Sequence, residues 1–301
     1  MSSPTTFTRT DCDFLSDGTR CSAWAYRPSD VERPPVVVMA HGFGGVKKFK
    51  LPEYAERFAA AGLVVLLFDY RYTGESDGQP RNLINHRLQQ ADWRAAVAHA
   101  RTLPDVDQER IGLWGTSFSG GHAIVTAAND PRIAALSIQV PMVDVTACSM
   151  RRFGLPFAMQ ATFHALWDMA QSLLLGRPHE VPIVALPGSF AVLNKRGCQE
   201  GYDALVPEGE TLENHCPARV CLTSMFYRAT KSAQRVRCPA LVVLAEKDQL
   251  IPPDVVRKAA AKMDSAEVVG LPLDHFEHYQ GAAFEEVVAL QTEFLLQTLR
   301  R

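Results

Sequence analysis

The fold of this chain is decided by the stretch Leu113-Trp114-Gly115-Thr116-Ser117-Phe118-Ser119-Gly120-Gly121. An apolar run leads directly through Ser117 into a segment that begins like a helix. A nucleophilic serine needs such a sharp strand-to-helix turn, with small residues two positions away on either side. Gly115 meets this requirement, and Ser119 stands where glycine is usual but is small enough to be accommodated. The stretch therefore predicts that Ser117 is a nucleophile, against the alternative of a serine that only caps a helix.

Apolar strands and amphipathic helices alternate on both sides of this stretch. The expected strands cover residues 36–40, 64–68, 111–114, 133–140, 241–245 and 267–271, and the expected helices cover residues 51–61, 83–103, 120–128, 253–263 and 282–299. Continuous apolar strands are typical of a parallel sheet that is buried on both faces. Residues 5–27 predict an antiparallel hairpin that turns at Asp17-Gly18. We therefore expect an α/β fold with a mostly parallel central sheet and helices on both faces.

One long segment interrupts this alternation. Residues 143–237 lie between two expected strands and contain a helical pattern of their own at residues 157–175. A plain connection between a strand and the next element is much shorter. We expect residues 1–142 and 238–301 to form the core and residues 143–237 to form an inserted cap. The cap should cover the carboxyl ends of the strands, where α/β proteins bind ligands.

A carboxylate that could orient a catalytic base follows the strand expected at residues 241–245. In one common arrangement, a nucleophilic serine at such a turn is followed in the chain by an acid and then by a histidine. Asp248 fits the position of the acid. Glu246 is nearer to the strand, and Asp144 follows an earlier strand at a second place where such an acid can stand. Asp248 is the prediction, and both alternatives stay open here.

The loop after the last expected strand offers the base. His275 comes first after this strand and is predicted to take the proton from Ser117. His278 is one helical turn further on and is interpreted as a neighbour or pocket residue. A metal site formed by these two histidines has no further ligands to support it, so we expect no metal and no cofactor.

A glycine-rich loop, His41-Gly42-Phe43-Gly44-Gly45, follows the strand expected at residues 36–40. In this position the backbone amides of Phe43 and Phe118 are the expected donors to an oxyanion. A simple turn that needs glycine for a positive φ angle is compatible with the same loop. His41 itself is expected to brace the loop.

Five motifs in this order together resemble the α/β-hydrolase superfamily: HGFGG at residues 41–45, FDYRYTGESDG at 68–78, GTSFSGG at 115–121, AEKD at 245–248 and DHFEHY at 274–279. The leading hairpin and the second motif resemble the dienelactone-hydrolase-like and Xaa-Pro-peptidase-like branch, which includes polyketide transferases and thioesterases. This resemblance implies acyl transfer from an ester, thioester or amide through an acyl-serine, without a cofactor.

The leading hypothesis is a serine hydrolase that cleaves a carboxylic ester or thioester of a small molecule. An acyltransferase with the same catalytic residues and a non-catalytic binding protein on the same fold are the alternatives. Epoxide hydrolases and dehalogenases are disfavoured because they use aspartate, not serine, as the nucleophile in this strand-to-helix turn. An apolar acyl pocket is expected in the cap, unless these side chains only form the cap's own core; its candidate residues are Phe153, Phe157, Trp167 and Phe226. His278, in the loop after the last strand, is a further candidate pocket residue.

The composition is that of an ordinary globular protein. The 301 residues are 47% hydrophobic and 21% charged, with a formal net charge of −2. This balance gives no attraction to nucleic acid, and no apolar run is long enough to span a membrane. The N-terminus does not resemble a signal peptide, so we expect a cytoplasmic protein with seven free cysteines, against the alternative of a Cys12–Cys21 disulfide. A homo-oligomer is compatible with the sequence.

Overall fold

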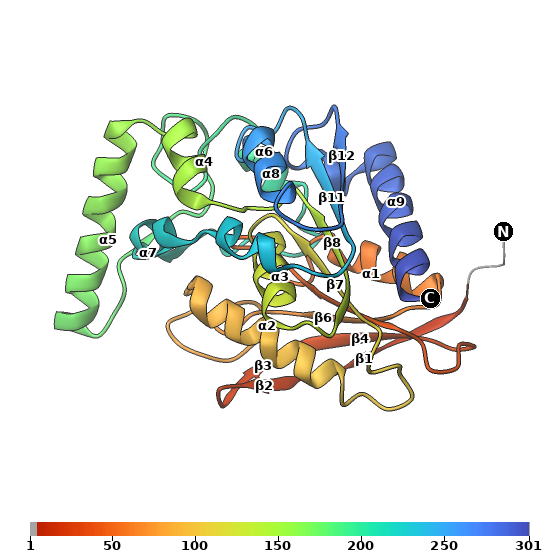
Figure 1. Cartoon of the computed structure of the whole chain (residues 1–301). Helices are drawn as coiled ribbons and strands as arrows, with labels where there is room; N and C mark the ends of the chain where they lie inside the picture. The colour runs from red at the N-terminus through yellow and green to blue at the C-terminus, as the bar shows by residue number, and fades with distance from the viewer. Residues whose placement is uncertain (1–4, 301) are drawn as a thin grey trace.

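A central sheet of eight strands organises the molecule (Figure 1). The computed structural model describes residues 5–300. In spatial order the strands are β1 (Phe7–Asp11), β4 (Ala23–Pro28), β6 (Val64–Phe68), β5 (Val36–Ala40), β7 (Ile111–Thr116), β8 (Ile133–Gln139), β11 (Ala240–Ala245) and β12 (Ala266–Leu271). β1 and β4 are antiparallel to their neighbours, and all other neighbouring strands run parallel. The mostly parallel α/β sheet predicted from the sequence is confirmed.

Helices cover both faces of this sheet. The long helices outside the segment between β8 and β11 are α1 (Leu51–Ala60), α2 (His86–Ala100), α3 (Phe118–Asn129), α8 (Pro253–Ala260) and α9 (Gly281–Leu299). α1 and α9 pack on one face, and α2, α3 and α8 pack on the other. Alternate side chains of a strand point to opposite faces, so β5 directs Val36 and Val38 to the second layer and Val37 and Met39 to the first.

The first strands form the expected antiparallel hairpin in two parts. β1 pairs with β4, and the short strands β2 (Phe14–Ser16) and β3 (Thr19–Cys21) extend the hairpin beyond them. Asp17 and Gly18 form the turn with φ angles of 47° and 79°. Two consecutive positive φ angles are the geometry that an Asp-Gly hairpin turn favours.

The long helix expected at residues 83–103 is shorter than its sequence pattern. It begins at His86 because the side chain of Asn85 accepts hydrogen bonds from the backbone N–H groups of Arg87 and Leu88. It ends at Ala100, three residues before the expected end. The amphipathic pattern continues past both ends because the flanking residues also pack against the core.

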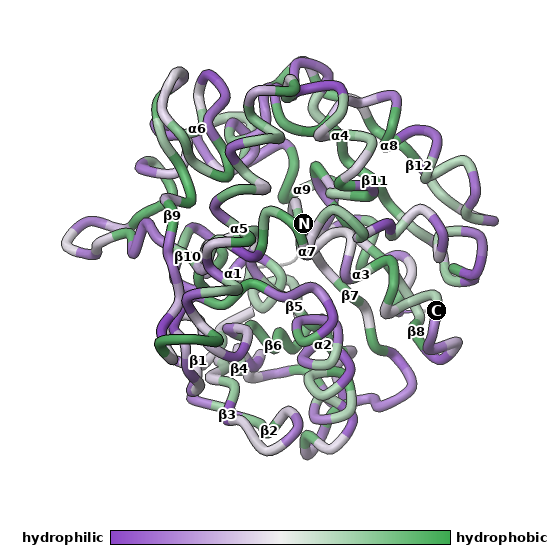
Figure 2. Tube along the Cα trace, turned by 90° about the vertical axis from the view of Figure 1, so that its left-hand side faces the viewer, coloured by the Kyte–Doolittle hydropathy of each residue, from purple (hydrophilic) through white to green (hydrophobic). Residues whose placement is uncertain are grey.

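The chain leaves the sheet between β8 and β11. This segment holds α4 (Val145–Arg152), α5 (Leu155–Leu175), β9 (Glu180–Val181), α6 (Cys198–Asp203), β10 (Cys216–Pro217) and α7 (Val220–Thr223), followed by short 3₁₀ turns. α5 corresponds to the helix expected at residues 157–175, whereas α4, α6 and α7 were not predicted. α5 stands at the edge of the molecule farthest from the sheet, and Figure 2 views the molecule from that side.

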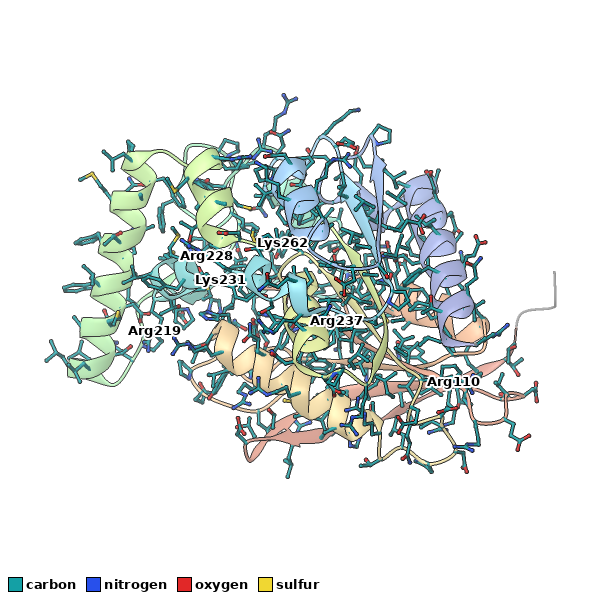
Figure 3. All side chains as sticks on the ribbon, in the orientation of Figure 1. Arg110, Arg219, Arg228, Lys231, Arg237 and Lys262 are labelled. Carbon is teal, nitrogen blue, oxygen red and sulfur yellow. The ribbon has the colours of Figure 1, made fainter. Side chains whose placement is uncertain are left out.

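An ion pair with a buried carboxylate attaches α5 to the rest of this segment. The carboxylate of Asp168 is fully buried and accepts hydrogen bonds from the Nε and Nη2 of Arg219 at 2.7 and 2.9 Å. It also accepts bonds from the backbone N–H groups of Arg219 and His179. Arg219 lies between α5 and the core in Figure 3. All seven cysteines are free thiols.

Candidate active site

Ser117 occupies a strained turn between β7 and α3. Its φ and ψ angles are 52° and −119°, which are unusual for any residue with a side chain. The backbone N–H of Ser117 donates to the carbonyl of Gln139 at 3.0 Å, and the N–H of Met142 donates to the carbonyl of Ser117 at 2.7 Å. A Cβ atom added at Gly115 would lie 2.7 Å from the carbonyl oxygen of Ser119, so this turn requires glycine there. The fully buried Ser119 is accommodated in the first turn of α3.

His275 and Asp248 lie beside Ser117, in the loops that follow β12 and β11. The Nε2 atom of His275 is 3.2 Å from the Oγ of Ser117, and its Nδ1 is 2.7 Å from Oδ2 of Asp248. With the proton on Nδ1, His275 donates to Asp248 and its Nε2 can accept the proton of Ser117. The other carboxylate oxygen of Asp248 accepts the backbone N–H groups of Leu250 and Ile251, both at 2.7 Å. The structure therefore brings the three residues together in a chain of hydrogen bonds.

The two alternative carboxylates have other partners. Asp144 caps α4 by accepting the backbone N–H of Ala147 at 2.9 Å, and Arg228 lies 3.8 Å from it. Glu246 forms an ion pair with Arg257 at the surface. The carboxylate in contact with His275 is that of Asp248.

The glycine-rich loop passes directly over Ser117. A Cβ atom added at Gly42 would lie 3.2 Å from the Cβ of Ser117, so a larger residue would push the loop away. The rings of Phe43 and Phe118 meet edge to face with centroids 5.6 Å apart. The residues whose amides were expected to serve an oxyanion are thus neighbours on either side of Ser117. The hydroxyl of Tyr202, from α6, donates to the carbonyl of Phe43.

His41 begins this loop, and its hydrogen bond is to the backbone of the loop itself. Its Nδ1 is 2.9 Å from the carbonyl of Gly42, and its Nε2 is 3.7 Å from the carboxylate of Asp69. Burial lowers the pKa of His41, which favours the neutral ring. Asp69 also accepts the backbone N–H and the ammonium group of the buried Lys47, at 2.6 and 3.0 Å. This network attaches both ends of the glycine-rich loop to the loop that follows β6.

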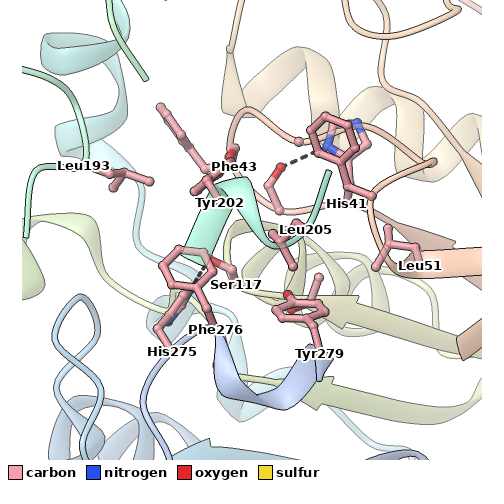
Figure 4. A pocket seen from close by; sticks show the side chains of 14 residues that line it. His41, Phe43, Leu51, Ser117, Leu193, Tyr202, Leu205, His275, Phe276 and Tyr279 are labelled. Atoms are coloured by element: carbon pink, nitrogen blue, oxygen red, sulfur yellow. Dashed lines mark hydrogen bonds between the residues drawn. The ribbon is translucent and has the colours of Figure 1, made fainter. Parts of the chain in front are cut away.

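Two cavities meet at Ser117. The smaller one, of about 30 Å³, is lined by residues from the glycine-rich loop, α6 and the His275 loop (Figure 4). The larger one, of about 400 Å³, extends from Ser117, Phe43 and Phe118 to α4 and α5. Small-molecule sites usually enclose about 300–1,000 Å³. The larger cavity is therefore the better fit for a ligand.

Two of the five expected pocket residues line the larger cavity. Phe153 and Phe157 do so, with stacked rings whose centroids are 4.3 Å apart. Sequence reasoning missed Cys148, on α4, and Ala161, on α5, because such small side chains give no recognisable signal.

The other three expected pocket residues lie away from it. Trp167 and Phe226 are 53% and 77% exposed, and neither lines the cavity. Both side chains lie on the solvent-facing side of their elements. Apolar residues occur on more than one side of these elements, so the sequence pattern did not show which side faces the cavity. His278 is fully buried near α1, where the hydroxyl of Tyr54 donates to its backbone carbonyl. Burial lowers the pKa of His278 to about 4, so its ring is neutral near pH 7.

Within residues 5–300, no group of three or more His, Cys, Asp and Glu side chains gathers closely enough to hold a metal ion. Over the same residues, no helix has both the length and the apolar character needed to cross a membrane.

Comparison with known proteins identifies the family. The model of the X-Pro dipeptidyl-peptidase (S15) family matches residues 17–251, which is well over half of the chain. The chain belongs to this family. The matched region runs from the leading hairpin past Ser117 to the loop that contains Asp248. The resemblance to the α/β hydrolases that was noted from the motifs is thereby confirmed.

Full-length relatives and a solved structure agree with this assignment. The quorum-quenching protein AidA of Acinetobacter baumannii is 39% identical, over 95% of this chain and 93% of its own. The thiohydrolase aneE of Aspergillus aculeatus is 30% identical, over 88% and 86%. The crystal structure of the α/β hydrolase GrgF from Penicillium sp. sh18 is 28% identical and superposes with a TM-score of 0.84, covering 98% of this chain and 100% of that one. Proteins named as hydrolases are thus similar to this family member over nearly its whole length.

Proposed function

We propose that this protein is a serine hydrolase that cleaves a carboxylic ester or thioester through an acyl-serine intermediate. The observation that carries the proposal is the chain of hydrogen bonds from Ser117 through His275 to Asp248. A serine hydroxyl becomes an effective nucleophile when a base takes its proton and an acid orients that base. All three residues stand in loops at the carboxyl end of the sheet, which is where α/β enzymes carry their sites.

The reaction then has two halves. Ser117 Oγ attacks the acyl carbonyl while its proton passes to Nε2 of His275, and the oxyanion forms under the glycine-rich loop. Collapse of this intermediate breaks the bond to the leaving alcohol or thiol, which receives the proton from His275. Water attacks the acyl-serine in the second half with the same assistance, and the acid is released. Asp248 stabilises the imidazolium that forms in each half.

The backbone amides of Phe43 and Phe118 are the proposed oxyanion donors. The close approach of Gly42 to Ser117 and the contact between the two phenylalanine rings support this assignment. Phe118 is also the first residue of α3, whose N-terminus favours negative charge. Donors that are already aimed at the developing charge lower the barrier more than donors that must reorient.

The larger cavity is the proposed acyl site, and residues 143–237 are the proposed cap that forms its outer wall. Apolar side chains from α4, from α5 and from the turn between them line it together with Phe43 and Phe118; among them are Phe153 in that turn and Phe157 in α5. Such a lining favours an acyl group that is itself largely apolar.

Acyl transfer to an alcohol or amine is the second candidate, and the apolar lining of this cavity favours it. An apolar cavity holds few ordered waters, so water would attack an acyl-serine there slowly. The intermediate would then persist until an alcohol or amine binds. The same catalytic residues would serve. Incubation with an acyl thioester and a set of alcohols and amines separates the two activities, because hydrolysis yields only the free acid.

The test of the proposal is the Ser117→Ala variant. We expect it to lose labelling by a fluorophosphonate probe and to lose roughly 10⁴-fold or more in kcat with p-nitrophenyl esters. Ser137→Ala is the matched control, because the hydroxyl of Ser137 is buried in β8 and has no hydrogen-bond partner among the described residues. Full esterase activity in Ser117→Ala, or no labelling of the folded wild-type protein, would contradict the proposal. Ligand binding without turnover would instead indicate a non-catalytic protein on this fold.

A further inference from the structure

The outer side of α5 is an exposed apolar surface at the edge of the molecule. Side chains along its whole length are more than half exposed, among them Leu155, Met159, Phe163, Leu166, Trp167 and Leu173. We call these six residues the α5 face. α5 lies at the left edge of Figure 1 and toward the viewer in Figure 2.

The α5 face carries no charge. The only charged residue of the 21-residue helix is Asp168, which points inward and pairs with Arg219. The inward side of α5 also includes Ala161 and Ala165, which are buried. The outward side of α5 is therefore both apolar and exposed, whereas the apolar side of a helix normally packs against another element.

The size of the surface points to a macromolecular partner. The six side chains of the α5 face are 53–86% exposed, and a large side chain offers roughly 150–250 Å² in full, so together they present an apolar area on the order of 800 Å². The largest apolar patch on a monomeric protein is usually about 300–600 Å². A stable protein–protein interface buries about 800 Å² on each partner. The outer side of α5 is thus large enough to form most of one such interface.

We propose that two copies of this chain associate through the α5 face around a twofold axis. A twofold interface places the same surface of both copies face to face, so a net charge on that surface would be repelled by the equal net charge of its copy. The uncharged α5 face avoids this repulsion. A twofold axis perpendicular to α5 also makes the two helices antiparallel, which aligns their dipoles favourably. The partner that this surface fits best is therefore the α5 face of a second copy of the chain.

A lipid surface fits this face less well. Helices that lie in a membrane interface combine an apolar side with a polar side rich in Lys and Arg. α5 contains neither residue.

Analytical ultracentrifugation of the full chain tests the proposal. We expect the wild-type protein to be a dimer and the double variant Phe163→Glu, Leu166→Glu to be a monomer, with dimer affinity weakened by at least ~100-fold. Leu15→Glu is the matched control, because Leu15 is 69% exposed in the β2–β3 hairpin. We expect this control to remain a dimer. Circular dichroism shows whether each variant is folded. If the double variant does not fold, Trp167→Lys takes its place and should likewise be a monomer.

Three outcomes would overturn the proposal. The first is a wild-type protein that stays monomeric across a wide range of concentration. The second is an α5 variant that dimerises as well as the wild type, or a Leu15→Glu control that dissociates equally. The third is a wild-type monomer that binds neutral phosphatidylcholine vesicles when the α5 variant does not, which would assign the surface to lipid. None of these readouts depends on hydrolytic activity, so they separate this proposal from the proposed function.

Discussion

Ser117 carries a backbone conformation that costs free energy, of order 1–3 kcal/mol for a side chain in a sparsely populated region. The surrounding structure holds it there through hydrogen bonds on both sides of the residue, from β8 and from the loop after it. The strain has a geometric result, because it projects Oγ toward His275 while the chain enters α3. A relaxed conformation at this residue would redirect the side chain away from the base.

At the residue scale, Asp248→Asn tests which carboxylate orients the base. The amide can donate to Nδ1 of His275, which would leave the proton on Nε2 and block transfer from Ser117. We expect kcat for a p-nitrophenyl ester to fall roughly 10³–10⁴-fold with KM little changed. Steady-state kinetics at saturating ester measure this, and fluorophosphonate labelling should slow in parallel.

Glu246→Gln and Asp144→Asn are the controls for this prediction. Glu246 pairs with Arg257 at the surface and Asp144 caps α4, so neither change should alter kcat by more than about twofold. A collapse of activity in Asp144→Asn with little effect of Asp248→Asn would reverse the assignment.

The identity of these site residues could be proposed from the sequence because each directly follows a strand. The carboxyl ends of parallel strands meet at one edge, so Ser117, Asp248 and His275 were expected to converge there, and their side chains do lie in contact. The choice between Asp248 and Asp144 was open at that stage because both follow strands. Only the three-dimensional contacts of each carboxylate distinguish them.

At the scale of elements, the strands were predicted closely and the segment between β8 and β11 poorly. Apolar runs such as Val36–Ala40 and Val64–Phe68 are easily recognised as strands of a parallel sheet, since such a strand is buried on both faces. α5 was found, but its apolar residues surround the helix, so periodicity could not show which side lines the cavity. Phe157 lines the larger cavity, whereas Trp167, expected at the same pocket, does not. α4 is a short helix that begins where the side chain of Asp144 accepts a backbone N–H of its first turn. From the sequence, Asp144 was an alternative for the catalytic acid and not an expected helix cap.

The wall that α5 forms should set the size of the acyl group. Ala161 lines the larger cavity and is buried, so Ala161→Phe would fill part of it. We expect kcat/KM for p-nitrophenyl esters of long acyl chains to fall at least ~10-fold, and that for the acetate ester to change little. The measurement is a chain-length series with wild type and variant.

Ala282→Phe is the matched control for this substitution, because Ala282 is an exposed residue near the start of α9, away from the cavity. It should leave the whole series unchanged. A uniform loss across all chain lengths in Ala161→Phe would indicate that the acyl group does not enter this cavity.

At the scale of the whole molecule, the segment between β8 and β11 shares the core of the sheet. One continuous cluster of buried side chains joins Val38 of β5 and Ile124 of α3 to Val220 and Tyr227 of this segment. Tyr227 packs closely against α3, where a Cβ added at Gly121 would meet its hydroxyl at 2.6 Å. The proposed cap therefore shares its buried side chains with the core, although the chain leaves the sheet to form it.

This continuity predicts that core and cap unfold together. Differential scanning calorimetry at one protein concentration should show a single transition, with loss of esterase activity at the same temperature. Arg219→Ala leaves the buried Asp168 without its charge partner, which typically costs about 3–5 kcal/mol. Because the units are coupled, this variant should lower the temperature of the whole transition by several degrees and should not split it.

Arg237→Ala is the control for this variant. It removes an exposed ion pair with Asp264 and should shift the transition temperature by less than a degree or two. A separate low-temperature transition in Arg219→Ala, with the sheet still folded above it, would mean that the cap is an independent folding unit.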